Sequence, residues 1–489
     1  MIIGIVIVTS DSPSLEKIEV ILEKDSSLVI ERGQFVTIPK NEKIEVIGLI
    51  SGIKKYNAYY ETLEASAHEI ASRDYQSIFP IDEWENTIAE IKPLGELDTE
   101  NQTVSRVKYP VSPGSKVYRS SPHSIEVFLG LDKSGLHLGY LQSNEVDIRL
   151  NISRMLRKHL AVLAISGAGK SYAASVLLEE ILKYGKLGVI VIDPHGEYSN
   201  LCNLSEYQEN IEVLNGSLIS IGVPELSAWD FSEFIPEMSV VQTRVLEGII
   251  SIIKKMNLEH YSILDLIKQL ERAKGVNPRT RDAMIGWLYS LHQTYLFSPE
   301  SNLDFQNLLF PGKTVILNLS DLHSLRARRL QVLYFLKNLY SLRIQNRIPP
   351  IVFIIEEAHQ FCPESSRSIS KRIIETIARE GRKFYCSLCL ISQRPVNLSV
   401  TALSQCNSNL ILRIRNPYDL DFIGRTSEGI DRSTLKIIPD LEVGEALLVG
   451  ESINYPIFFK IRARKYHDVS ISPNLQQAAE SYAKKYQSK

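Results

Sequence analysis

The sequence lacks a long apolar run. None of its apolar stretches reaches the roughly 20 residues that a membrane-spanning helix requires. Its opening, "MIIGIVIVTSDS", is apolar but has neither the basic lead-in nor the small-residue cleavage site of a secretory signal, so we interpret it as a strand. These absences predict a soluble, cytoplasmic protein that does not enter a membrane.

Cysteine is scarce, and so is net charge. The chain has 5 cysteines in 489 residues, a usage that is typical of a reducing compartment. Cys386 and Cys389 form a C-x-x-C within the apolar stretch "KFYCSLCLISQ". Residues three apart on a strand point to opposite faces, which favours a buried strand over a redox or zinc pair. Because the formal net charge is only -2, a nucleic-acid surface would need its basic residues gathered in a groove or pore.

The apolar patterning changes near residue 150, and no internal repeat or low-complexity tract interrupts it. Residues 1–150 show short strands between turn signals, which predicts a small closed barrel with a helical insertion near 62–90. Residues 151–470 alternate fully apolar runs with helical stretches, the pattern of a parallel sheet covered by helices. A helical subdomain is predicted near 225–300, and a polar tail at 471–489.

A candidate phosphate-binding loop joins the first of these apolar runs to a helix, in "AISGAGKSYAAS". Small residues let successive backbone N–H groups converge on phosphate oxygens, while Lys170 would reach the β- and γ-phosphates and Ser171 would bind Mg²⁺. Ala164 replaces the usual first glycine, which is tolerable where φ stays negative. The residues expected to hold the nucleotide are Gly167, Ala168, Gly169, Lys170, Ser171 and Tyr172.

Two adjacent carboxylates follow the apolar strand in "IVFIIEEAHQF". ATP hydrolysis needs one acid for Mg²⁺ and another to orient the attacking water, and we assign these roles to Glu356 and Glu357. Gln393, in "LISQRP", stands where it could sense the γ-phosphate. The polar residues of "IDPHGEY", which include Asp193, lack the spacing of a zinc centre and are expected to order a loop.

Two basic clusters each allow two interpretations. Arg379 and Arg382, in "IAREGRKFY", are either a solvated helix end or arginines that stabilise the phosphates bound to a neighbouring subunit. The stretch "CPESSRSISKR" is either an exposed helix start or a loop that contacts nucleic-acid phosphates without reading bases. Its candidate residues are Arg367, Lys371 and Arg372.

Six motifs in order, "SGAGKS", "VIDPHGEY", "FIIEEAHQF", "IAREGRKF", "LISQRP" and "SQCNSNLILRIRNPYDLDFI", resemble the HerA family of hexameric ATPases, which are relatives of the FtsK DNA pumps. The resemblance implies an α/β, RecA-like P-loop ATPase core with an N-terminal barrel of the kind found in rotary ATP synthases. It also implies ATP and Mg²⁺ as ligands and six subunits around duplex DNA. A site between subunits makes Arg382 the first choice of arginine finger, and Arg379 the second. Lys158 stands where relatives commonly carry arginine, a position that would contact the neighbour's nucleotide. A lysine there supplies the charge but not the two parallel hydrogen bonds of a guanidinium group.

The function predicted from this resemblance is ATP-driven translocation of double-stranded DNA. The partner would be a NurA-like nuclease or a defence effector, either sirtuin-like or a nuclease, in DNA end processing or anti-phage defence. The alternative is a ring-shaped scaffold that binds ATP mainly to assemble and regulate an effector enzyme.

Overall fold

A computed structural model of the chain divides it into two compact units. The first comprises residues 1–151 and 453–460, and the second comprises 152–452 and 461–489. The structure describes residues 2–23, 30–56, 85–203, 206–256, 258–427, 429–465 and 479–480. Most of the helical insertion predicted near 62–90 lies outside these ranges, as does most of the tail predicted at 471–489.

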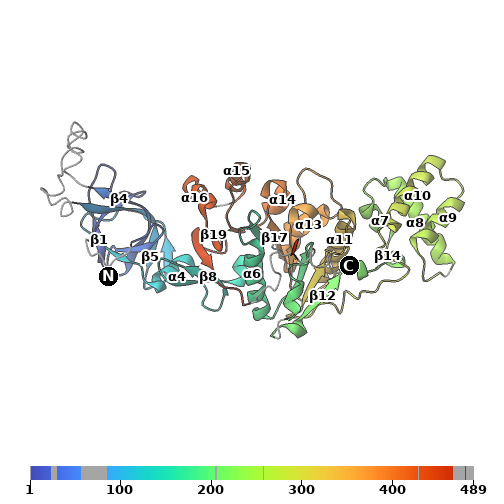
Figure 1. Cartoon of the computed structure of the whole chain (residues 1–489), viewed down its shortest axis with the longest axis horizontal. Coiled ribbons are helices and arrows are strands. Elements are labelled where there is room, and N and C mark those ends of the chain that lie inside the picture. Colours follow the sequence, from blue (N-terminus) through green and yellow to red (C-terminus); the bar gives the residue numbers. More distant parts are fainter. Residues whose placement is uncertain are drawn as a thin grey trace. The chain divides into compact units, whose positions relative to one another are not determined.

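The first unit contains a closed antiparallel barrel (Figure 1). Its strands are β1 (Ile2–Val6), β2 (Ile18–Leu22), β3 (Phe35–Pro39), β4 (Ile44–Tyr56), β5 (Asn86–Asp98), β6 (Thr103–Ser105) and β7 (Lys116–Arg119). They follow the order β2-β1-β7-β3-β4-β5-β6, and the pairing of β2 with β5 closes a barrel of six strands. Alternate side chains such as Val20, Val36 and Ile91 are buried inside it, as a half-buried strand requires.

The first unit also holds α4 (Pro122–Leu129), β8 (Leu136–Leu141), β9 (Val146–Leu150) and β20 (Ile457–Ile461). The apolar pattern predicts a core that extends to residue 470, but residues 453–460 group with the barrel unit. The physical reason is a close approach of β20 to β8: a methyl group at Gly139 would collide with the carbonyl oxygen of Lys460. A contact of this kind joins residues far apart in the chain and leaves no local pattern.

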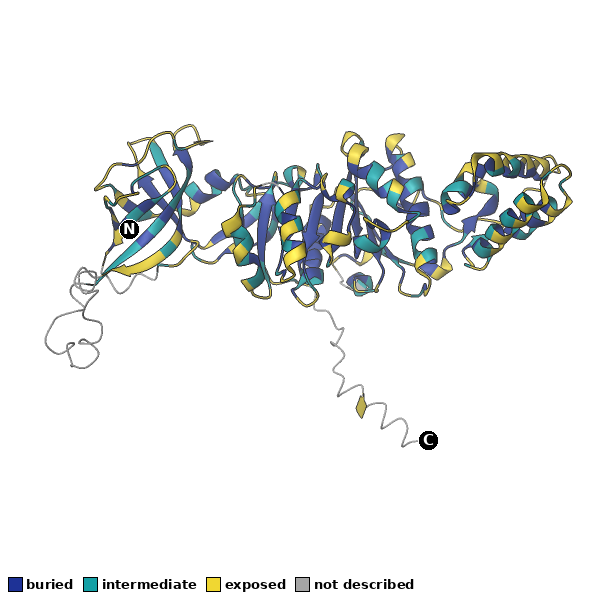
Figure 2. Ribbon diagram, turned by 90° about the horizontal axis from the view of Figure 1, so that it is seen from above, coloured by how far each residue is buried: buried dark blue, intermediate teal, exposed yellow. Residues whose placement is uncertain are grey.

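The second unit is built on a mostly parallel sheet whose central strands are buried on both faces (Figure 2). Its strands are β10 (Leu160–Leu163), β11 (Gly188–Asp193), β12 (Ile211–Asn215), β15 (Thr314–Asn318), β16 (Ile351–Ile355), β17 (Cys386–Ser392), β18 (Ser408–Ile411) and β19 (Glu445–Gly450). Within the unit they lie in the order β12-β15-β11-β16-β17-β10-β18-β19, and only the β18–β19 pairing is antiparallel. Both cysteines of the C-x-x-C lie buried in β17, and neither forms a disulfide.

Helices flank this sheet. They are α5 (Ile152–Leu156), α6 (Lys170–Tyr184), α11 (Leu325–Ile344), α12 (Ala358–Phe361), α13 (Lys371–Glu380), α14 (Val400–Leu403), α15 (Pro417–Thr426) and α16 (Arg432–Ile437). The predicted α/β class is confirmed. Among the described residues, no helix is both long and apolar enough to span a membrane.

A helical subdomain interrupts the sheet between β12 and β15. It contains α7 (Ala228–Phe234), α8 (Val240–Lys255), α9 (Ile263–Arg272) and α10 (Pro278–His292), with the short strands β13 (Ile221–Gly222) and β14 (Phe297–Ser298) at its base. Serines at the N-caps of α7, α8 and α9 form capping boxes, which fix where these helices begin. Lys337 of α11 holds the subdomain to the core through Asp230 and Glu233, with each N–O distance 2.6 Å.

A buried histidine joins the start of β10 to its neighbours. The backbone N–H of Leu388 donates to Nδ1 of His159 at 2.9 Å, so Nε2 carries the proton and donates to the carbonyl oxygen of Ala378, also at 2.9 Å. His159 has φ 62° and is almost fully buried. Burial lowers the pKa of His159 to about 4, which means that the folded chain requires the neutral imidazole.

Protonation of His159 should make the stability of the protein depend on pH. Because its folded pKa lies below its ordinary value of 6.5, its stabilising contribution is present above pH 6.5 and is lost as pH falls toward 4. The free energy of unfolding of the wild-type protein should therefore fall by about 2 kcal/mol between pH 7.5 and pH 5 because of this group. The His159→Gln variant should be less stable than wild type at pH 7.5, and its stability should depend less on pH. Thermal unfolding of both proteins at several pH values measures this. Parallel pH profiles for the two proteins would contradict this account.

Candidate nucleotide site

The phosphate-binding loop connects β10 to α6 at the carboxyl edge of the parallel sheet. Gly167 has φ 77° and Gly169 has φ 92°, a left-handed conformation that a side chain would strain. Ala164 is fully buried at the end of β10, where its N–H donates to the carbonyl oxygen of Ser392 at 3.2 Å, and its φ is not positive. The alanine that departs from the usual motif is therefore accommodated without strain.

The ammonium group of Lys170 lies between two buried carboxylates. Its Nζ atom is 2.7 Å from Oε1 of Glu356 and forms a second, shorter ion pair with Oε1 of Glu357. Burial on its own would lower the pKa of Lys170, but the charges of the two glutamates outweigh it and raise the pKa above its ordinary value. Lys170 is therefore a cation that neutralises both acids.

Glu356 is almost completely buried and is held from a second side. The hydroxyl of Tyr198 donates to its Oε2 at 3.0 Å. Burial raises the pKa of Glu356 to about 7, an effect that the nearby charge of Lys170 partly opposes. Tyr198 is positioned by Asp193, whose carboxylate accepts the backbone N–H groups of Gly196 at 2.8 Å and Tyr198 at 2.9 Å. The motif "IDPHGEY" thus orders a loop that presents a tyrosine to the acid.

Glu357 directly follows Glu356 but points to different partners. Its φ of 49° is left-handed, so the chain turns sharply there before α12 begins. Its Oε2 lies 3.3 Å from Nδ1 of His359, and that same nitrogen lies 3.2 Å from Oγ of Ser392. His359 therefore links the acid to the end of β17. Within the described ranges, no three His, Cys, Asp or Glu side chains cluster closely enough to hold a metal ion.

The order of the strands explains why distant motifs meet. β17 lies between β10 and β16, and the three strands are parallel. Their carboxyl ends therefore place the phosphate loop, the half-buried Gln393 and the two glutamates at one edge of the sheet. One edge of the sheet thus carries a lysine, a polar amide and paired acids, a set suited to phosphoryl chemistry.

The residues predicted to act on a neighbour lie at the opposite edge. Lys158 precedes β10 and forms an ion pair with Glu451. Arg379 lies in the last turn of α13, and Arg382 lies in the turn before β17; both side chains are exposed. A strand of four to seven residues spans about 13–23 Å, so these cations stand well away from this chain's own phosphate loop. Lys158 consequently does not belong to the phosphate site of its own chain.

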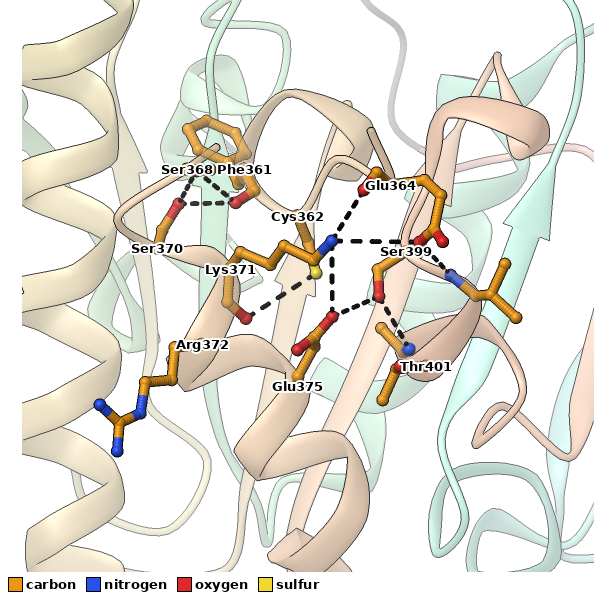
Figure 3. A network of polar contacts seen from close by, with 12 residues as sticks. Phe361, Cys362, Glu364, Ser368, Ser370, Lys371, Arg372, Glu375, Ser399 and Thr401 are labelled. Atoms are coloured by element: carbon orange, nitrogen blue, oxygen red, sulfur yellow. Dashed lines mark hydrogen bonds and ion pairs between the residues drawn. The ribbon is translucent and has the colours of Figure 1, made fainter. Parts of the chain in front are cut away.

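Lys371 joins two loops at the carboxyl edge of the sheet (Figure 3). Its Nζ donates to the carbonyl oxygen of Glu364 at 2.9 Å and lies 3.8 Å from the carboxylate of Glu375. That carboxylate also accepts the hydroxyl of Ser399, which belongs to the loop after β17, at 2.6 Å. The ammonium is thus engaged inside the protein, which argues against its predicted role as a contact for DNA.

Arg367 and Arg372 flank this network, and both are exposed. The side chain of Arg372 points away from the Lys371 contacts (Figure 3). These two arginines are therefore the cations of the segment that stay available to an external anion.

The predicted magnesium ligands suit that ion chemically. Ser171 supplies a half-buried hydroxyl at the start of α6, and Glu356 supplies a carboxylate. Mg²⁺ prefers such hard oxygen donors and completes its shell with water and substrate phosphates. Ser171 and Glu356 therefore fit as the residues that would hold it.

Comparison with known proteins finds similarity to one family of helicases. The model of the central domain of the helicase HerA matches residues 136–339. The DNA double-strand break repair helicase HerA of Pyrococcus furiosus is 26% identical over 88% of this chain and 87% of its own length. The chain is thus similar to the HerA family, in its central part by the family model and over most of its length by this relative. This similarity confirms the predicted resemblance, and with it the prediction of a P-loop ATPase.

Solved structures share the fold of this core. VirB4 of Thermoanaerobacter pseudethanolicus superposes with a TM-score of 0.55 at 18% identity, covering 68% of this chain and 98% of its own. The plasmid coupling protein TrwB, solved with a non-hydrolysable ATP analogue, gives a TM-score of 0.52 at 13% identity, covering 72% and 94%. At these identities the likeness establishes the fold alone.

The Lys170 ion pairs should be measurable in the nucleotide-free protein. Lys170→Met leaves two buried acids without a counter-charge, so its unfolding free energy should fall by about 2–4 kcal/mol at pH 8. In a Glu357→Gln background the same substitution should cost less, which gives a coupling energy of about 1–3 kcal/mol. Chemical denaturation of the four proteins of this cycle measures the coupling. Strictly additive losses would show that the lysine and the glutamate do not interact.

Proposed function

We propose that this HerA-like chain is an ATP-driven translocase of double-stranded DNA that works as a homohexamer. The proposal rests chiefly on the two edges of the sheet: Lys170, Glu357 and Gln393 stand at one, and Arg379 and Arg382 at the other. Each edge supplies half of a phosphoryl-transfer site, and the halves can meet only between copies of the chain. The DNA substrate is suggested by the Pyrococcus relative, whose name is that of a DNA double-strand break repair helicase.

The ion pairs of Lys170 suggest how Glu357 would be kept from activating water until ATP binds. Lys170 and His359 both contact the carboxylate of Glu357, and while these contacts hold, this acid would not orient water. The β- and γ-phosphates of ATP offer Lys170 a stronger set of acceptors. As Lys170 turns to them, Glu357 becomes the group that positions the attacking water, and Gln393 faces the γ-phosphate.

Ser171 and Glu356 would hold Mg²⁺. When bound, the ion supplies positive charge to the β- and γ-phosphate oxygens. Tyr198 keeps the carboxylate of Glu356 oriented through its 3.0 Å hydrogen bond.

The arginines at the far edge complete the site of the neighbouring copy. Arg382 is the first candidate and Arg379 the second, because both are exposed and near the start of β17. An arginine supplied by a neighbour is worth roughly 10³–10⁵ in rate. Lys158, which is paired with Glu451, lies at the same edge and would add charge without a bidentate contact.

The loops that follow β16 and β17 would contact the DNA. The Lys371 network joins these loops, so they would move together when Glu357 and Gln393 respond to the nucleotide. Arg367 and Arg372 are the exposed cations placed to meet the phosphate backbone. Binding of this kind is indifferent to sequence and weakens with salt.

The motor would act with a partner enzyme, either a NurA-like nuclease or a defence effector, in DNA end processing or anti-phage defence. The alternative is a scaffold that binds ATP to assemble an effector and translocates little. Effector activity that persists in a hydrolysis-dead ring would favour the scaffold.

Glu357→Gln provides the first test of the translocase. The amide keeps the shape of the side chain but cannot polarise water, so ATP turnover should fall by about 10²–10⁴-fold while ATP binding remains. Turnover is measured with and without linear duplex DNA, with Glu209→Gln as a matched exposed control. Wild-type turnover should rise with duplex. ATP turnover that changes neither with duplex DNA nor with the Glu357 substitution would exclude the translocase hypothesis.

A mixing experiment tests whether the site is shared between copies. Arg382→Ala and Glu357→Gln should each be nearly inactive alone. In randomly mixed rings, however, roughly a quarter of the interfaces combine an intact glutamate with an intact arginine. An equimolar mixture that exchanges subunits should thus recover about a quarter of wild-type ATPase activity. The Arg382→Ala, Glu357→Gln double variant serves as the control. If subunit exchange is verified and the mixture recovers no ATPase activity, Arg382 does not act in the neighbour's site.

A further inference from the structure

A short segment after β20 returns to the ATPase core and runs along the helix of the phosphate loop. We call residues 461–465 the strap. The N–H of Ile461 donates to the carbonyl oxygen of Gly444 at 2.8 Å, and the N–H of Lys465 donates to Oε1 of Glu179 at 2.9 Å. The strap therefore extends from the turn before β19 to the second half of α6.

Buried charges anchor the strap. The guanidinium of Arg462 lies 2.9 Å from both Glu179 and Glu180 on α6. The side chain of Glu179 is only 2% exposed and that of Arg462 only 11%. Removing the strap would leave two carboxylates in the interior without their counter-charge, which is costly. The strap is thus a fixed wall beside α6.

Arg464 of the strap meets the first turn of α6. Its N–H donates to the hydroxyl of Tyr172 at 2.9 Å, and its guanidinium lies 5.2 Å from the centre of the tyrosine ring. Tyr172 directly follows Ser171, the predicted magnesium ligand. A planar cation on an aromatic ring therefore stands within a few residues of the phosphate loop.

The strand order indicates which end of a nucleotide lies near this pair. Lys170 reaches from β10 toward the acids of β16, so the γ-phosphate end points across β17. On the other side of β10 are β18 and the turn before β19, where a side chain at Gly169 would meet Val443 and Gly444. Val443 is 60% exposed. The nucleoside end must therefore lie on the side where the strap begins.

From this arrangement we propose that the strap forms the base-binding wall of the nucleotide site, with the purine base of ATP packing against Tyr172 and Arg464. Val443 provides the apolar edge of the same wall. Stacking on a planar cation and an aromatic ring recognises the flat face of the base, and Arg462 keeps that surface in place through the buried acids. The inference rests on the proposed function, because it requires ATP in the phosphate loop.

The test compares a ligand that has a base with one that has none. Calorimetric titration of the full-length protein measures the affinities for Mg-ATP and for inorganic tripolyphosphate. Arg464→Ala should weaken ATP binding about 10-fold and change tripolyphosphate binding less than about 2-fold. Arg464→Lys keeps the charge but loses the plane, and should behave like the alanine variant. Lys183→Ala, which removes an exposed cation near the far end of α6 and outside the strap, is the matched control and should bind both ligands normally.

Three outcomes would overturn the inference. Equal weakening of both ligands would mean that Arg464 acts on the phosphates or on the fold, and unchanged ATP binding would place the base elsewhere. Normal ATP binding by Tyr172→Leu, which keeps an apolar side chain without the ring, would exclude stacking on the tyrosine. Wild type that binds neither ligand would instead refute the proposed function. Thermal unfolding of each variant separates a loss of base binding from a loss of folding.

Discussion

The site depends on one buried cation between two buried acids. Without Lys170, the carboxylates of Glu356 and Glu357 would share an interior position as uncompensated like charges. This neutralisation lets the two acids lie together at the edge of the sheet. In the mechanism that we propose, the phosphates of ATP compete with these carboxylates for Lys170. Nucleotide binding would thereby release Glu357.

The rest of the core serves to bring these three side chains together and to connect them outward. The strand order β16-β17-β10 sets the acids, Gln393 and the phosphate loop at one edge. His359 ties Glu357 to the end of β17, and the Lys371 network then joins the loops after β16 and β17. In the proposed mechanism, these hydrogen-bonded contacts would carry a change at the phosphates to the two loops.

The sequence was enough to predict the α/β class and the family, because fully apolar runs and ordered motifs are local signals. Its residue types also singled out Lys170 and the paired glutamates, which the structure brings together; their roles in hydrolysis stay a prediction. It could not indicate that Tyr198 binds Glu356 or that Lys371 is engaged by Glu364, since these contacts depend on which strands are neighbours. For the same reason, the grouping of residues 453–460 with the barrel unit was missed.

The central claim is that nucleotide binding moves Lys170 from the acids to the phosphates. A structure of the protein with Mg²⁺ and a non-hydrolysable ATP analogue tests this most directly. The account predicts that Nζ of Lys170 contacts β- and γ-phosphate oxygens and lies beyond ion-pair distance from Glu357. A nucleotide-bound structure in which Lys170 keeps both of its glutamate contacts would contradict the account.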